Sequence, residues 1–203
     1  MEDSKPVVTP VGSQFKLKSL TLEEWERQKH LMDTTPYASA VGSLMYAMIV
    51  TRPDLGFAVG LVSRFMSKPS REHWEAVKWV MRYLKRASEV CLYFTKNDQF
   101  QVEGFCASDY STDRDKRRSV TGHVFQVGGN TVSWRLALQH VVALSTTEAE
   151  YMALSEATKE GFWDILDFGL LKIHTTLNPA DMPTKGLPGN ALEKFLVTLG
   201  VTA

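Results

Sequence analysis

The chain has 203 residues, which is enough for one large domain or two small ones. Hydrophobic residues make up 44% of the chain, so it can bury a substantial core, and 23 basic residues balance 23 acidic ones. The balance excludes a general basic field for nucleic acid, so any such contact must come from a local patch. Two cysteines are too few for a disulfide framework and suit a reducing compartment.

The N-terminal residues contain acidic side chains and an early proline, and they lack the basic start and apolar run of a signal peptide. The most apolar stretch, residues 40–50, is too short to span a bilayer. We therefore expect no membrane partner and an intracellular protein, in the cytoplasm or the nucleus.

The first part of the chain is predicted to be helical. Residues 1–20 contain prolines and little periodicity, so they are expected to form an extended leader. Residues 21–88 form the helical region, in which Thr21 and Glu24 have the spacing of a capping box at the first helix. The expected helices cover residues 22–32, 36–50, 53–66 and 70–88.

The helix over residues 70–88 has the clearest pattern, and Ser70 is its expected cap. Its apolar residues recur at spacings of three and four and predict one buried face, made of Trp74, Val77, Met81 and Leu84. Basic residues share another face, made of Lys78, Arg82, Lys85 and Arg86. This basic face either contacts nucleic-acid phosphates or is an ordinary solvated helix surface.

Residues 89–203 change to a pattern of short strands and helices, so the whole chain is predicted to be α+β. Gly128, Gly129 and Asn130 are expected to form a hairpin turn. The expected strands cover residues 90–95, 101–107, 121–127, 131–135, 139–144 and 171–175. Helices are expected over residues 145–162 and 190–199.

Several sequence blocks resemble one known family. They are similar to the end of copia-type retrotransposon Pol polyproteins, from just after the reverse transcriptase core through the ribonuclease H module. The blocks occur in the family's order and cover nearly the whole chain. They are residues 37–46, 51–54, 73–78, 145–154, 178–182 and 184–185.

The resemblance implies a ribonuclease H fold, in which four carboxylates hold two magnesium ions that clamp the attacking and leaving oxygens. Glu150 matches the helix glutamate and Asp181 matches the C-terminal aspartate. Counting from Gly104, the first-strand aspartate is replaced by Ala107. Asp109 is two residues along on the same strand face, where it could substitute for the lost ligand.

The third carboxylate of the family lies on a strand followed by a second helix, a crossover of about 30 residues. Here residues 162–169 run almost directly into 171–174, so the crossover is missing. Asp164 and Asp167 are the local acids and are expected to be solvated. The resemblance therefore implies an incomplete ribonuclease H-like fold, whose first strand has an open edge unless residues 171–175 fill it.

With two carboxylates of four, we expect that the Mg²⁺ site is lost, that no cofactor is bound and that the chain has no ribonuclease H activity. No polymerase aspartate pair is present either. On this interpretation Met1 corresponds to an internal methionine of the polyprotein, and the chain is a truncated, non-enzymatic remnant.

Two other functions stay open. The segment Arg82-Tyr83-Leu84-Lys85 resembles the Arg-x-Leu-Arg motif of secreted oomycete effectors, which would imply secretion into a host cell and host proteins as partners. It departs from that motif in its fourth residue and in lying on an expected helix, and so short a pattern also matches by chance. The other function is weak nucleic-acid binding through the basic helix face.

Overall fold

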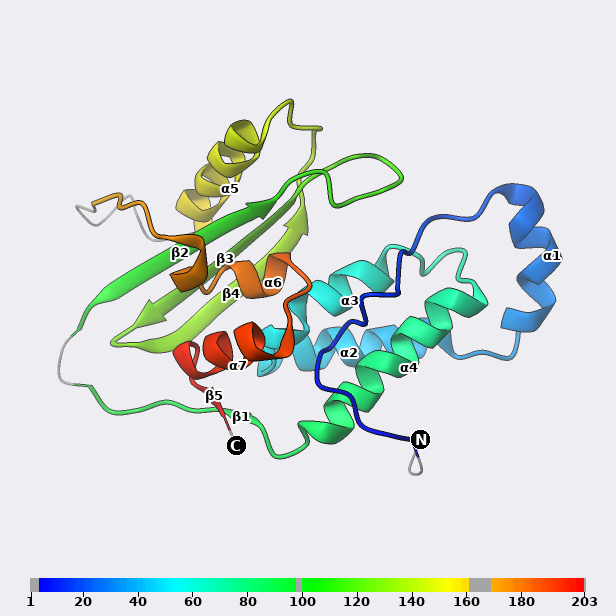
Figure 1. Ribbon diagram of the computed structural model, residues 1–203, viewed down its shortest axis with the longest axis horizontal. Helices are drawn as coiled ribbons and strands as arrows, with labels where there is room; N and C mark the ends of the chain where they lie inside the picture. Colours follow the sequence, from blue (N-terminus) through cyan, green and yellow to red (C-terminus); the bar gives the residue numbers. More distant parts are fainter. Residues whose placement is uncertain (1–3, 98–99, 161–168, 203) are drawn as a thin grey trace.

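The structure is a computed structural model that describes residues 4–97, 100–160 and 169–202. It combines helices with an antiparallel sheet, which confirms the α+β class (Figure 1). The helices before the sheet are α1 (Leu22–Met32), α2 (Tyr37–Val50), a 3₁₀ turn at Pro53–Leu55, α3 (Gly56–Ser63) and α4 (Arg71–Arg86). None of the helices in these ranges is both long and apolar enough to cross a membrane.

Local sequence signals set the starts of two helices as predicted. The Thr21 hydroxyl accepts a hydrogen bond from the Glu24 N–H while the Glu24 carboxylate accepts one from the Thr21 N–H, which completes the capping box of α1. Ser70 caps α4 in the same reciprocal way, with His73 in place of the glutamate. Side-chain caps of this kind satisfy backbone donors that the first helical turn leaves free.

The third helix differs from its prediction. It divides into the Pro53–Leu55 turn and α3, which ends at Ser63 rather than at residue 66. The chain turns tightly where Phe65 N–H donates to the Val62 carbonyl. This turn buries the Phe65 ring, which stacks on His73 at a centroid distance of 3.9 Å.

The buried face of α4 is rotated relative to its prediction. Of the four predicted residues, Val77 is fully buried, while Trp74, Met81 and Leu84 are partly buried and pack around the edge of the core. The fully buried residues are His73, Ala76, Val77, Val80 and Tyr83. The sequence pattern missed this face because two of its members, His73 and Tyr83, are polar residues that are buried through specific hydrogen bonds.

The leader is extended, as predicted, but it is also part of the packed structure. The Trp79 indole N–H of α4 donates to the Thr9 carbonyl at 2.9 Å. Phe15 packs edge-on against the same indole, and Val7 and Leu17 are buried in the core. The leader therefore belongs to the hydrophobic core that α4 helps to form.

The sheet is the predicted three-stranded meander of β2 (Val102–Asp109), β3 (Val120–Val127) and β4 (Asn130–Leu138). All pairings are antiparallel, in the order β2-β3-β4. Gly128 and Gly129 have φ angles of 56° and 76° and make the two-residue turn between β3 and β4. Glycine suits this turn because both central positions need positive φ.

Three predicted strands are wrong or much shorter. Residues 139–144 form no strand, and the Gln139 side chain turns inward and donates to the Ala149 carbonyl. Residues 171–175 form no strand either, and Leu171 is 88% exposed, so no apolar face anchors that segment. The strand over 90–95 reduces to β1 (Cys91–Leu92), which pairs with the terminal β5 (Val201–Thr202) instead of with the meander.

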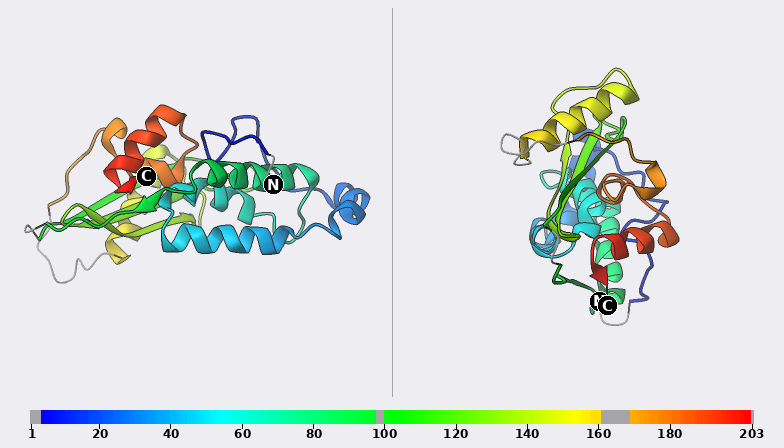
Figure 2. Two further views of the ribbon diagram at one scale, coloured as in Figure 1. Left: turned by 90° about the horizontal axis from the view of Figure 1, so that it is seen from below. Right: turned by 90° about the vertical axis from the view of Figure 1, so that its left-hand side faces the viewer.

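The remaining helices are α5 (Thr146–Glu160), a 3₁₀ turn at Thr175–Leu177, α6 (Asp181–Thr184) and α7 (Gly189–Thr198). Among them, α5 and α6 pack on the sheet. Both ends of α7 lie within one residue of the predicted ends. The start of α5 also lies within one residue of its predicted start, and residue 160 is the last residue of α5 that the structure describes. Figure 2 shows α7 close to the short β1–β5 pair.

One hydrophobic cluster joins the helical region to the sheet. It contains residues of α2, α3 and α4 together with Val124 of β3 and Phe195 of α7. The Trp134 indole of β4 donates to the Met48 carbonyl of α2 at 2.8 Å. At Gly60 of α3 an added Cβ would lie 2.3 Å from the end of the Leu136 side chain, so glycine lets this side chain approach the helix closely. The domain boundary near residue 88, between the helical region and the ribonuclease H-like region, remains a prediction from the sequence.

A buried ion pair fastens the chain between α2 and α3 to the end of α4. Arg52 is 6% exposed and Asp54 is 1% exposed. The guanidinium donates to both carboxylate oxygens, at 2.9 Å and 2.7 Å, and also to the Ala87 carbonyl at 3.0 Å. The Tyr83 hydroxyl donates to the Asp54 carboxylate at 2.7 Å. Burial and the Asp54 charge raise the pKa of Tyr83, so this hydroxyl keeps its proton.

Removing members of this network should lower stability in a graded way. Tyr83→Phe deletes one hydrogen bond to a buried charge and should reduce the free energy of unfolding by about 1–3 kcal/mol. Asp54→Asn leaves the Arg52 charge buried without its counter-ion and should reduce it by about 3–5 kcal/mol. Urea unfolding measures both values. The control is Glu75→Gln, which breaks the exposed ion pair with Lys78 and should change the free energy of unfolding by less than about 1 kcal/mol. Equal effects in all three variants would contradict a stabilising role for the buried network.

Two buried histidines should make stability depend on pH. His73 accepts the Ser70 N–H at Nδ1 and approaches the Lys18 carbonyl through Nε2 at 3.1 Å, an arrangement that suits the neutral ring. His123 is 2% exposed, and its Nε2 lies 3.6 Å from the Glu160 carboxylate, too far for a hydrogen bond. Burial lowers the pKa of both rings below the ordinary value of 6.5.

Stability is expected to fall as the pH drops below about 6.5, because the unfolded chain then binds protons that the folded histidines resist. Urea unfolding from about pH 7.5 to about pH 5 measures this slope. His123→Phe cannot be protonated and should flatten the slope, whereas the exposed control His30→Gln should leave it unchanged. An unaltered slope in His123→Phe would show that this ring does not contribute.

Candidate functional site

The site predicted from the sequence is centred on Ala107 in the middle of β2. Ala107 is 2% exposed and pairs with Gly122 of β3, so both residues face the same side of the sheet. On that side α6 packs against the sheet so closely that a Cβ on Gly122 would lie 2.5 Å from the Thr184 side chain. Ala107 therefore sits on the face of the sheet that α6 covers.

Glu150 reaches β2 from α5. Its carboxylate accepts a hydrogen bond from the Ser108 N–H at 3.1 Å. Burial raises the pKa of the neighbouring Cys106 thiol, and the charge of Glu150 adds to this effect. Glu148 is directed elsewhere, as expected for a two-residue step on a helix, and accepts a hydrogen bond from the Leu144 N–H.

Asp181 begins α6 and is 4% exposed. Its carboxylate accepts a hydrogen bond from the Lys185 ammonium at 2.9 Å, one helical turn further on. The preceding Asn178 donates to the Cys106 carbonyl at 2.9 Å and accepts from the Ala180 N–H. Asn178 thus holds α6 against β2, a role that sequence reasoning missed although an asparagine before proline is a common turn signal.

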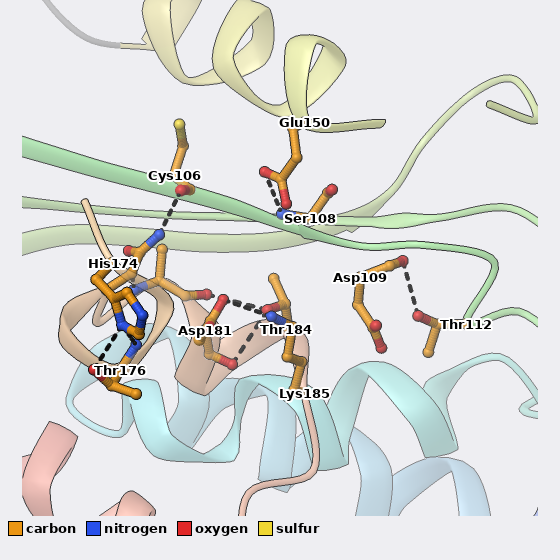
Figure 3. A network of polar contacts seen from close by, with 12 residues as sticks. Cys106, Ser108, Asp109, Thr112, Glu150, His174, Thr176, Asp181, Thr184 and Lys185 are labelled. Atoms are coloured by element: carbon orange, nitrogen blue, oxygen red, sulfur yellow. Dashed lines mark hydrogen bonds and ion pairs between the residues drawn. The ribbon is translucent and has the colours of Figure 1, made fainter. Parts of the chain in front are cut away.

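Figure 3 shows Glu150 on one side of the β2 ribbon and Asp181 with Lys185 on the other. Asp109 lies further along the strand, where its carbonyl accepts a hydrogen bond from Thr112. Over residues 4–97, 100–160 and 169–202, no group of three or more His, Cys, Asp or Glu side chains is placed to hold a metal ion. Asp164 and Asp167 lie outside the described residues.

The free edge of β2 is partly occupied by side chains. Among the strands that the structure describes, β2 pairs with β3 alone, so the backbone groups of alternate β2 residues point away from the sheet. Two of these edge groups are bonded, the Ser108 N–H to Glu150 and the Cys106 carbonyl to Asn178. The predicted replacement strand at residues 171–175 is absent, and these two side chains contact the edge instead.

The basic face of α4 is engaged with the protein itself. Lys78 forms an ion pair with Glu75 at 2.7 Å. Arg82 and Lys85 donate to backbone carbonyls of the leader, and the Arg82 guanidinium also lies 5.1 Å from the Trp79 ring. Arg86 is exposed at the helix end. Nucleic-acid binding by this face stays a prediction.

The Arg-x-Leu-Arg-like segment is part of the same helix. Within Arg82-Tyr83-Leu84-Lys85, Tyr83 is 3% exposed and bonded to Asp54, and Leu84 packs on the core. The segment is therefore folded, and a receptor that reads the four residues together would have to unwind α4.

Comparison with known proteins gives a consistent result. The chain is 48% identical over 163 residues to the retrovirus-related Pol polyprotein from transposon TNT 1-94 of Nicotiana tabacum, and 34% identical over 163 residues to that from transposon RE2 of Arabidopsis thaliana. Each alignment covers 80% of this chain but only 12% and 11% of the polyproteins, so the chain spans a small part of their length.

A further relative is the secreted RxLR effector protein 161 of Plasmopara viticola, which is 49% identical over 132 residues, covering 65% of this chain and 93% of that protein. No protein-family model matches the chain. No solved structure matches it either. The high identity to transposon polyproteins over four fifths of the sequence shows that the chain belongs to the copia-type retrotransposon Pol polyprotein family.

Proposed function

We propose that this chain is a catalytically inactive remnant of a copia-type Pol polyprotein with an incomplete ribonuclease H-like C-terminal part. The observation that carries the proposal is Ala107. It occupies the centre of β2, beneath α6, at the position that the family resemblance assigns to the first metal-binding aspartate. A methyl group at this position cannot coordinate a cation.

The order of elements supports the ribonuclease H-like assignment. Three consecutive antiparallel strands are followed by α5, which packs on β2 and β3. The family resemblance expects this order of strands and first helix. The assignment also explains why α5 carries Glu150 toward β2 and why α6 begins with Asp181 on the far side of that strand.

The remaining carboxylates fit a pair of magnesium ions poorly. Magnesium requires hard oxygen ligands that are free to coordinate it. Here the Asp181 carboxylate is paired with the Lys185 ammonium and the Glu150 carboxylate accepts a backbone N–H. An ammonium group 2.9 Å from a would-be ligand opposes the approach of a divalent cation electrostatically. These contacts support a site that has lost its metals.

The chain should not cleave the RNA strand of an RNA–DNA hybrid in the presence of magnesium or manganese. Gel analysis of a labelled hybrid measures this, with an active ribonuclease H as the positive control. Ala107→Asp alone should not restore cleavage, because the third carboxylate is still missing.

The matched variant is Glu150→Gln, whose amide oxygen can still accept the Ser108 N–H and so keeps the local structure. Metal-dependent cleavage that is present in the natural chain and lost in Glu150→Gln would reject the proposal. Cleavage that persists in Glu150→Gln would indicate a contaminating nuclease. The proposal then stands only if repurified protein no longer cleaves the hybrid.

A second candidate function is a secreted effector that reuses this scaffold inside host cells. The observation in its favour is the 49% identity to the secreted RxLR effector protein 161, of which this chain covers 93%. The sequence Arg82-Tyr83-Leu84-Lys85 would then be the targeting segment, although it lies within α4.

A tagged full chain tests this second function by its location. If the chain is an effector, the protein should appear in the secreted fraction and in host cells. Arg82→Gln should then reduce its uptake into host cells, while Lys78→Gln, on the same helix face but outside the motif, should not. Recovery of the protein only from the producing cells would reject the effector function.

A further inference from the structure

A pocket of about 640 Å³ lies where four segments of the chain meet. The leader forms one wall and α3 another, while the loop between β2 and β3 and the linker between α6 and α7 close the remaining sides. The volume falls within the range of about 300–1,000 Å³ that is usual for small-molecule sites. The pocket is separate from the Glu150 and Asp181 positions, neither of which lines it.

The lining of the pocket combines apolar and charged side chains. Phe15, Leu61 and Leu187 provide apolar surface from three different segments. Arg64, which follows the last residue of α3, lines the pocket together with Asp113 and Asp115 of the loop between β2 and β3. A site of this composition suits a ligand with an apolar body and one polar group.

Part of the Arg64 guanidinium is buried without a hydrogen-bond partner among the described residues. Its Nε atom is fully buried without a hydrogen bond, and the guanidinium forms no hydrogen bond or ion pair within the part of the chain that the structure describes. Burial lowers the pKa of Arg64 and the Arg118 charge adds to this effect, while the charges of Asp113 and Asp115 partly oppose it. A guanidinium carries five N–H donors, and a buried donor that finds no acceptor is unfavourable.

The acids of the same loop are already satisfied by the protein. The Asp115 carboxylate accepts hydrogen bonds from the Ser19 N–H at 2.9 Å and from the Ser19 hydroxyl at 2.6 Å. The Asp113 carboxylate accepts the N–H groups of Asp115 and Lys116 and lies 3.8 Å from the Arg118 Nε. The pocket group that lacks a hydrogen-bond partner is therefore the Arg64 guanidinium, which is a donor, so a ligand that bonds to it must provide an acceptor.

The loop that faces Arg64 is held in an unusual conformation. Ser111, which lines the pocket, has a φ of 55°, and its N–H donates to the Ser119 hydroxyl at 3.1 Å. A non-glycine residue in this region is strained and persists where its surroundings fix it. The pocket wall is thus held in place by the protein's own bonds before any ligand arrives.

We propose that this pocket binds a small organic anion with an apolar body, and that Arg64 binds its anionic group. A carboxylate, sulfonate or phosphate oxygen would supply the acceptors that Arg64 lacks, in the planar arrangement that a guanidinium favours. The apolar part of the ligand would lie against Phe15, Leu61 and Leu187. The proposal is independent of the proposed function, since it uses none of the same residues.

A pair of fluorescent probes separates the two parts of the site. Anilinonaphthalene sulfonate has an aromatic body and a sulfonate, and phenylnaphthylamine has the same body without the charge. The full chain should bind one equivalent of the sulfonate probe and bind it more tightly than the neutral one. Arg64→Gln should weaken binding of the sulfonate probe about tenfold, because it removes a charge-assisted contact, and should leave binding of the neutral probe unchanged.

The matched control is Arg114→Gln, an exposed arginine on the same pocket lining, which should alter neither probe by more than about twofold. Urea unfolding provides an independent readout. Arg64→Gln should change the unfolding midpoint little, because the variant loses no hydrogen bond or ion pair that Arg64 makes within the described residues. Equal affinity for both probes, unchanged sulfonate binding in Arg64→Gln, or a loss of stability in that variant would overturn the proposal.

Discussion

The buried pair of Arg52 and Asp54 is the constraint on which the arrangement of the helices depends. Two charges taken out of water are tolerated only when each is fully bonded, and here two distant segments of the chain must meet to bond them. Arg52 and the Pro53–Leu55 turn supply the pair, and the C-terminal end of α4 supplies the Tyr83 hydroxyl and the Ala87 carbonyl. Since α3 begins directly after this turn, the same bonds set where α3 lies.

The position of α3 then determines how the sheet can pack. An added Cβ on Gly56 would lie 3.0 Å from Pro183 of α6, and Gly60 allows Leu136 of β4 to approach closely. These two glycines bring α3 against both the sheet and the helix that begins with Asp181. The helical region and the meander consequently share one core, and the side chains near Ala107 are held by contacts that originate far away in the sequence.

Sequence reasoning predicted the elements that have strong local signals and missed those that depend on distant partners. The capping residues Thr21 and Ser70 and the glycine turn at 128–129 act within a few residues, so their patterns are readable. The segments over 139–144 and 171–175 have strand-like composition. Whether they pair depends on a neighbouring strand, which composition does not encode. The same limit explains why the partners of Arg82 and Lys85 in the leader were not foreseen.

Within the candidate site, the sequence identified Glu150, Asp181 and Ala107 but not what now contacts them. Asn178 and Lys185 stood in a recognisable motif, yet their bonds to Cys106 and Asp181 depend on how α6 packs against β2. Arg64 carried no sequence signal at all, because an arginine without a partner can be recognised only from the surroundings that fail to provide one. Unfilled bonding capacity is a property of the fold.

The side chains along the edge of β2 also affect self-association of the protein. An edge strand with open backbone groups is a template on which a second molecule can add a strand, and repeated addition leads to fibres. Here an incoming strand would have to displace the charged Glu150 and the Asn178 amide from the backbone groups that they occupy. The contacts of Glu150 and Asn178 with β2 thus oppose self-association through this edge.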